Sequence, residues 1–132
     1  MCPLDEDPQH RGPAAYKVCL ARGPIRRRLA DDREAVLVIG HTANLGRCLQ
    51  EFRRGLASGK GQSEANRLNW INAVVRAEEP IVEEDLQCTF VRLDSEAVAK
   101  RLEAAWLKKY AQEFGELPPL NGAVPASCKV MV

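Results

Sequence analysis

The sequence predicts a small mixed α/β (α+β) domain in which helices flank a three-stranded antiparallel sheet. Three short segments have the alternating or continuously apolar pattern of strands, at 16–20, 35–39 and 86–93. Three longer segments repeat apolar residues at helical spacing, at about 43–55, 63–76 and 94–115. A chain of 132 residues is long enough for one domain with one hydrophobic core.

The first two predicted strands differ in pattern. From Tyr16 to Leu20 apolar residues alternate with Lys17 and Cys19, which favours one buried face. From Ala35 to Ile39 the chain is continuously apolar, which is typical of a strand buried on both faces. The loop at 22–33 should join them as an antiparallel hairpin. The third strand, at 86–93, again alternates apolar and polar residues.

The helices carry start and stop signals. The first runs from about Ala43 to Gly55, and its buried stripe should hold Leu45, Cys48, Leu49 and Phe52. Ser63 can cap the second helix, which reaches to about 76. Asp94 or Ser95 begins the last helix, and Gly115 is a suitable left-handed stop. Residues 1–13 are expected to be a flexible leader, 14–121 the domain, and 122–132 a tail.

Composition sets limits on function. Nineteen basic and eighteen acidic residues give a net charge of +1, so only local clustering can argue for nucleic acid. The five cysteines are scattered without a CxxC pair, which favours reduced thiols over disulfides or a zinc site. The longest apolar run is far too short to span a bilayer, so we expect no membrane partner and a cytoplasmic location.

One stretch ends a strand and opens a helix, with the sequence Val38-Ile39-Gly40-His41-Thr42-Ala43-Asn44-Leu45. Two segments further along belong with it, one beginning Glu103-Ala104-Ala105-Trp106 and the other reading Leu117-Pro118-Pro119-Leu120-Asn121. Together they resemble the GIY-YIG nuclease superfamily, whose members cut DNA with one divalent metal ion. The resemblance covers residues 14–121 and implies that family's three-stranded sheet flanked by helices.

The resemblance assigns roles to individual residues. Glu103 falls on the family's metal-binding glutamate, with Mg²⁺ or Mn²⁺ as the implied ion. Tyr16 falls on the tyrosine that faces the attacking water, and Asn121 on the asparagine that closes the domain. The residues themselves place Glu103 on the apolar helix face with Ala99 and Trp106, where a carboxylate must be paired or coordinated. Pairing with Lys100, on a partly exposed face, is the structural alternative.

Several family positions hold different residues. Val38 replaces the second tyrosine, and Cys48 occupies the arginine position. Arg47 is next to it, but one helical residue is a rotation of about 100°. Phe52 stands where relatives often have a tyrosine or histidine. His41 follows the triplet, where either catalysis or a role at the helix entry fits. Losing one preorganised donor typically costs about 10²–10³ in rate, so we expect weakened or lost phosphodiesterase activity.

Two basic clusters are candidates for phosphate contacts, with a solvated charged surface as the alternative. One cluster lies in the 22–33 loop, with Arg26, Arg27 and Arg28. The other surrounds the first helix, with Arg47, Arg53, Arg54 and Lys60. We expect the two clusters to flank one groove of the DNA-facing surface that the resemblance implies.

The sequence therefore predicts a GIY-YIG-like domain that binds DNA with little or no cleavage. One alternative is an active metal-dependent DNA endonuclease rebuilt around Arg47 or the 22–33 loop, and another is a protein-binding or inhibitory module without nucleic-acid contact. We also expect one concave surface to bring together Tyr16, Cys48, Glu103 and Asn121. Finding Tyr16 and Glu103 on opposite sides would overturn the roles of both.

Overall fold

The computed structural model describes residues 2–3, 11–58, 63–74 and 80–121. Its centre is an antiparallel sheet in the order β1-β6-β2-β5. Three strands are long: β2 (Ala14–Leu20), β5 (Val36–Thr42) and β6 (Leu86–Arg92). The short β1 (Cys2–Pro3) adds two residues at the β6 edge. The predicted α+β class with three antiparallel strands is confirmed.

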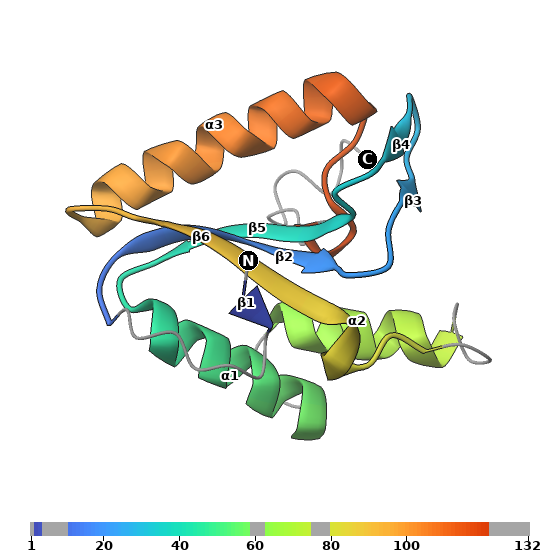
Figure 1. Cartoon of the computed structure of the whole chain (residues 1–132), viewed down its shortest axis with the longest axis horizontal. Helices are drawn as coiled ribbons and strands as arrows, with labels where there is room; N and C mark the ends of the chain where they lie inside the picture. The colour runs from blue at the N-terminus through green and yellow to red at the C-terminus, as the bar shows by residue number, and fades with distance from the viewer. Residues whose placement is uncertain (1, 4–10, 59–62, 75–79, 122–132) are drawn as a thin grey trace.

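Helices cover both faces of this sheet (Figure 1). Below it in that view lie α1 (Leu45–Ser58) and α2 (Ser63–Val74), and above it lies α3 (Glu96–Phe114). Each side has its own core cluster: the larger joins the sheet to α1 and α2, and the smaller joins it to α3. We call these two sides the α1 face and the α3 face of the sheet.

Alternation along β2 decides which face each of its side chains joins. Tyr16 and Val18 belong to the cluster on the α1 face, and Cys19 belongs to the cluster on the α3 face. Six of the seven β2 residues are buried because this central strand is covered on both sides. Its partner β5 is likewise buried from Val36 to Gly40, as its continuous apolar run predicts.

The start and stop signals read from the sequence for the last helix agree with the structure, whereas α1 begins at Leu45 with a cap that the sequence analysis did not name. The Asn44 side chain caps α1 by accepting a hydrogen bond from the Arg47 N–H at 3.1 Å. At the start of α3, Ser95 accepts from the Val98 N–H at 3.2 Å. The helix then ends at Gly115, which has the left-handed φ of 78°. These caps fix where α1 and α3 begin relative to the sheet.

The 22–33 segment holds more structure than the loop we predicted. It contains a two-strand hairpin of β3 (Ile25–Arg26) and β4 (Asp31–Asp32). The buried Asp32 carboxylate accepts hydrogen bonds from the N–H groups of Ala35 and Val36, at 3.1 and 2.9 Å, and from the Tyr110 hydroxyl at 2.8 Å. These bonds hold Ala35 at its positive φ of 56° and tie the hairpin to α3.

Two short 3₁₀ helices complete the described chain, η1 (Glu83–Asp85) before β6 and η2 (Pro119–Asn121) beside β5. The expectation of a flexible leader over 1–13 needs correction in part, since Cys2 and Pro3 pair with Cys88 and Gln87 of β6. The tail at 122–132 lies outside the described residues. Within the described segments, no helix has the length and apolar character needed to cross a membrane.

Candidate functional site

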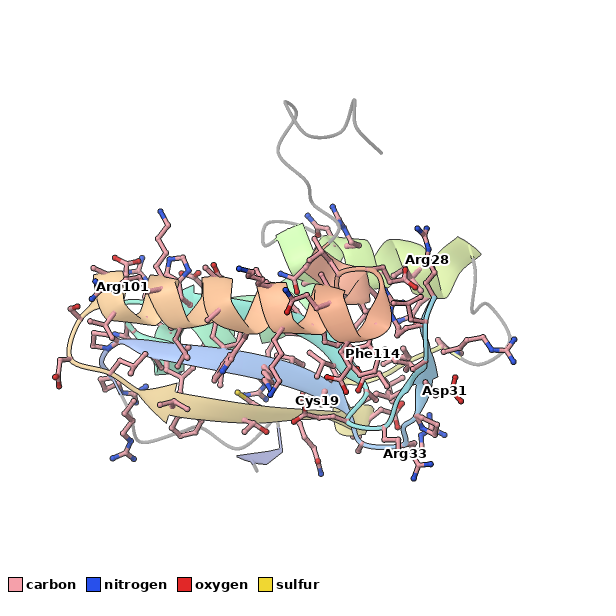
Figure 2. The ribbon with its side chains drawn as sticks, turned by 90° about the horizontal axis from the view of Figure 1, so that it is seen from above. Cys19, Arg28, Asp31, Arg33, Arg101 and Phe114 are labelled. Atoms are coloured by element: carbon pink, nitrogen blue, oxygen red, sulfur yellow. The ribbon has the colours of Figure 1, made fainter. Side chains whose placement is uncertain are left out.

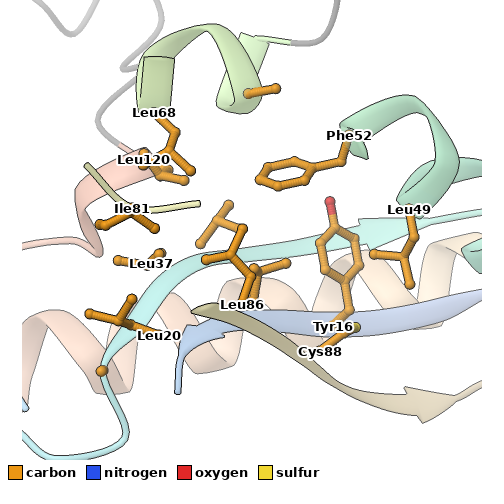
Figure 3. Close-up of a cluster of buried hydrophobic side chains, with 14 of the residues drawn as sticks. Tyr16, Leu20, Leu37, Leu49, Phe52, Leu68, Ile81, Leu86, Cys88 and Leu120 are labelled. Carbon is orange, nitrogen blue, oxygen red and sulfur yellow. The ribbon is translucent and has the colours of Figure 1, made fainter. Parts of the chain in front are cut away.

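The first pair of residues named by the resemblance meets on the α1 face. The Tyr16 ring stands on β2 and points toward Leu49 and Phe52 of α1 (Figure 3). Its hydroxyl accepts a hydrogen bond from the Cys48 thiol at 3.4 Å. Tyr16 is 5% exposed, so this hydroxyl sits inside a packed layer. The tyrosine position and the arginine position of the resemblance are therefore in contact, but a thiol carries no positive charge to the site.

Gly40 is required for this packing. It lies directly across from Tyr16 in the β2–β5 ladder. A Cβ atom at Gly40 would come within 2.5 Å of both the Cζ and the hydroxyl oxygen of Tyr16, a separation that real Cβ atoms do not adopt. The ring of Tyr16 thus passes close against the backbone of β5 at Gly40, which explains why a residue without a side chain is needed there.

The second pair meets on the α3 face. Glu103 of α3 brings a carboxylate oxygen to 3.1 Å from the Nδ1 atom of His41, at the end of β5. Both side chains are about a fifth to a quarter exposed. Although the distance is short, Nδ1 is buried and has no hydrogen bond of acceptable geometry among the described residues. The two side chains are therefore in close contact without an aligned hydrogen bond.

His41 also has a second acidic neighbour. Its Nε2 atom is 3.9 Å from a carboxylate oxygen of Glu96, in the first turn of α3. Among the described residues, no three His, Cys, Asp or Glu side chains are arranged so that they could hold one metal ion. The sequence required a partner for the Glu103 carboxylate. That partner is His41 of β5, and not Lys100 on the preceding turn of α3. The helix-entry role considered for His41 is performed by Asn44.

These two pairs do not form one concave surface. Tyr16 and Cys48 are packed on the α1 face, whereas Glu103 belongs to the helix that covers the opposite face. The expected convergence is wrong, and the reason is the period of two along β5. Gly40 presents its open side to Tyr16, while the next residue, His41, turns toward α3. By the criterion stated above, the joint catalytic assignment of Tyr16 and Glu103 does not hold.

Asn121 contacts the same motif from the edge of the sheet. Its amide oxygen accepts from the Ile39 N–H at 2.7 Å, and its amide nitrogen donates to the Ile39 carbonyl at 2.8 Å. The side chain thus imitates a neighbouring strand and satisfies the open edge of β5. A structural function explains this residue without a part in catalysis.

Arg47 points away from Cys48, as its place on the helix predicts. Its side chain is 77% exposed and pairs with Glu51 one turn later, with Nε 3.2 Å from the carboxylate. Arg53 is similarly engaged with Glu83, at 3.2 Å. Arg54 is exposed and has no ion pair among the described residues, and Lys60 lies outside them. The α1 cluster therefore offers fewer uncommitted charges than the sequence suggests.

The arginines of the β3–β4 hairpin likewise include one that is engaged within the fold and two that are exposed. The Arg27 guanidinium donates to the Leu117 carbonyl and pairs with Glu116 at 3.0 Å, so it anchors the hairpin to the end of α3. Arg26 and Arg28 are exposed. Because the hairpin packs beside the C-terminal end of α3, the two clusters lie on opposite sides of the sheet (Figure 1). They do not flank one groove, which corrects that expectation.

An open pocket of about 460 Å³ lies on the α3 face, between α3, the β3–β4 hairpin and strands β2 and β5. Figure 2 shows Asp31, Arg33 and Phe114 together at this end of the molecule, opposite Arg101. Lys17 of β2 reaches over the Trp106 ring, with its ammonium 4.9 Å from the ring centre, and also pairs with Glu34 at 3.3 Å. Neither Lys17 nor Trp106 has a function predicted from the sequence, although the alternation of β2 and the helical repeat from Glu103 place them on one face.

Two buried groups beside this pocket have raised pKa values. Burial raises the pKa of the Cys19 thiol from 9.0 to about 12, and the negative charges of Glu34 and Asp32 add to the effect. Burial and the hydrogen bond to Asp32 raise the pKa of Tyr110 well above its usual range. Both groups stay protonated at neutral pH, so neither serves as a nucleophile or a base.

Comparison with known proteins adds no relative. No family model, no curated protein and no solved structure matches this chain.

Proposed function

We propose that this chain is a GIY-YIG-like domain that binds DNA through phosphate contacts and has little or no phosphodiesterase activity. The observation that carries the loss of activity is the contact between Tyr16 and Cys48. Phosphoryl-transfer chemistry needs preorganised positive charge where negative charge develops. At the position that the resemblance gives to an arginine, this chain places a neutral thiol against a buried hydroxyl.

A divalent metal fits this arrangement poorly. Glu103 would supply one oxygen ligand, and Mg²⁺ can complete its shell with water and substrate phosphate. However, the Glu103 carboxylate lies 3.1 Å from His41 on the α3 face, with the sheet between it and the Tyr16 hydroxyl. A metal held by Glu103 would supply Lewis acidity away from the tyrosine that the resemblance pairs with it.

Exposed cations along α3 support the DNA-binding half of the proposal. Lys100, Arg101 and Lys108 are all exposed. Arg101 and Lys108 are seven residues apart, which places them on one side of the helix and about 10 Å from each other. Arg28 continues this line at the far end of α3, as Figure 2 shows. This row of cations is a better candidate for contact with the phosphate backbone than the paired arginines of α1.

The test measures DNA affinity by filter binding across a range of salt concentrations. One double variant, Arg101→Gln with Lys108→Gln, removes two charges from α3. Its matched control, Arg47→Gln with Arg54→Gln, removes two charges from α1. We expect the α3 variant alone to reduce the slope of log affinity against log salt by about two. Equal effects of both variants would contradict the α3 surface, and undetectable affinity at low salt would favour the protein-binding module.

The contact between His41 and Glu103 favours one other candidate, an active metal-dependent endonuclease. A carboxylate beside an imidazole can orient it as a general base. This candidate requires cleavage that depends on both residues and not on Tyr16. A supercoiled-plasmid assay with His41→Gln, Glu103→Gln and Tyr16→Phe separates it from the proposed function.

A further inference from the structure

The pocket between α3 and the β3–β4 hairpin has a chemical character of its own. Its volume of about 460 Å³ lies within the range of small-ligand sites, about 300–1,000 Å³. Tyr16 and Cys48 are on the other face of the sheet, so it is separate from them. Trp106, Tyr110 and Phe114 of α3 supply aromatic walls.

Charge favours a cation in this pocket. Four carboxylates line it, Asp31, Asp32, Glu34 and Glu113. Three cations also line it, Lys17, Arg33 and Lys109. The lining therefore carries one net negative charge. Burial is the main cause of the raised pKa of the neighbouring Cys19, and the charges of Glu34 and Asp32 add to it while that of Lys17 opposes it.

One cation already occupies the aromatic wall. The Lys17 ammonium lies 4.9 Å from the centre of the Trp106 ring and 3.3 Å from a Glu34 carboxylate oxygen. An aromatic face combined with a carboxylate is the combination that recognises organic ammonium groups. Lys17 is 23% exposed and its ion pair with the exposed Glu34 is weak, so a competing ligand can displace its flexible arm.

We propose that this pocket binds a small organic ammonium cation, and that Lys17 fills the site when the ligand is absent. The ligand's ammonium group takes the place of the Lys17 ammonium over Trp106, within reach of Glu34. Displaced into solvent, Lys17 remains hydrated at little cost. This binding site is independent of DNA binding and of phosphodiester chemistry, so its failure leaves the proposed function untouched.

The experiment uses the full chain and two probes of nearly equal shape. Choline is a quaternary ammonium ion, and 3,3-dimethyl-1-butanol is its uncharged carbon counterpart. Each is titrated while the indole N–H signal of Trp106 is followed by NMR, with the signal assigned from Trp106→Phe. We expect choline to shift this signal in a saturable way at millimolar concentration and the alcohol to leave it unchanged. Equal shifts with both probes, or no shift with either, would overturn the proposal.

Two variants distinguish the effect of Lys17 covering the Trp106 ring from the effect of the pocket's net charge. Lys17→Met and Arg33→Met each remove one positive charge from the pocket lining, but only the first vacates the Trp106 face. The cation–π contact at such a site corresponds to about a three-fold change in affinity. We therefore expect choline to bind about three-fold more tightly to Lys17→Met than to Arg33→Met. Equal affinities for the two variants would show that Lys17 does not compete for the site.

Discussion

The two faces of the sheet are built from the same strands but differ in chemistry. The α1 face is a large apolar layer, and its polar centre is the buried contact between Tyr16 and Cys48. The α3 face has a small apolar cluster and is rich in charge, with Asp32 buried beneath Tyr110 and His41 beside Glu103. Residues that the resemblance assigns to one site are thus divided between two environments, one apolar and one charged.

This division follows from how the fold holds the end of β5. Three separate contacts surround residues 39–41 of β5: the Tyr16 ring over Gly40, the Asn121 amide on Ile39, and the Glu103 carboxylate beside His41. Each is satisfied within the fold by another protein group. Packing, edge pairing and a close carboxylate contact therefore account for these three residues without chemistry on a phosphate.

The largest expected difference between the faces is in thiol reactivity. At pH 8 a thiol of pKa about 12 is ionised about a thousand-fold less than one at the usual value of 9.0. In a variant with Cys2→Ser and Cys128→Ser, we expect the partly exposed Cys48 to react with a disulfide reagent, while Cys19 stays unreacted. Cys19 should come into reaction only as the pH is raised well above the usual value of 9.0, because burial raises the pKa of its thiol.

The control for this measurement is Cys48→Ser in the same background, which should abolish the fast phase. Labelling of Cys19 at a rate close to that of Cys48 would contradict the compact packing assigned to the α3 face.

A second comparison concerns the buried carboxylate of the α3 face. Asp32→Ala removes the side-chain acceptor for the Val36 N–H and the Tyr110 hydroxyl, whereas the Ala35 N–H keeps its bond to the backbone carbonyl of residue 32. Each buried donor left unsatisfied costs about 1–3 kcal/mol. We expect a loss of about 3 kcal/mol in the free energy of unfolding, measured by urea denaturation. Tyr110→Phe removes only one of the three partners and should cost about 1 kcal/mol. Similar losses from both changes would show that the backbone bonds contribute little.

The packing of the apolar α1 face is tested where the Tyr16 ring approaches Gly40 of β5. Gly40→Ala forces the Tyr16 ring from its place, and overpacking of this kind typically costs about 1–3 kcal/mol. In a Tyr16→Leu background the added methyl group has room, so the second substitution should be nearly neutral. Denaturation of the four proteins of this double-mutant cycle measures the coupling. Additive losses would mean that the ring and the glycine do not meet.

The sequence predicted the elements well because local signals determine them. The stripe of Leu45, Leu49 and Phe52, the Ser95 cap and the Gly115 stop all appear where their spacing placed them. It could also identify Glu103 as a carboxylate that needs a partner. It could not supply the partner, because His41 is distant along the chain and the strand order decides that they meet.

The candidate site was harder to predict for the same reason. The division of Tyr16 and Glu103 depends on which face each side chain takes after β5 pairs with β2, and no local pattern encodes that choice. The pocket around Lys17 and Trp106 escaped notice because its members come from three separate segments. Asp32 was likewise read as a loop residue, although its buried hydrogen bonds organise the turn between β4 and β5 and tie it to α3.

The central claim is that this sheet keeps Tyr16 and Glu103 in separate environments, leaving no joint metal-dependent site. Its most direct test is cleavage of supercoiled plasmid by the full chain with Mg²⁺ or Mn²⁺, compared with Glu103→Ala and with Cys48→Arg. We expect cleavage at background for the unmodified chain and for Glu103→Ala, and no gain in Cys48→Arg that depends on Glu103. Robust metal-dependent cutting by the unmodified chain, abolished by Glu103→Ala and also by Tyr16→Phe, would contradict the claim.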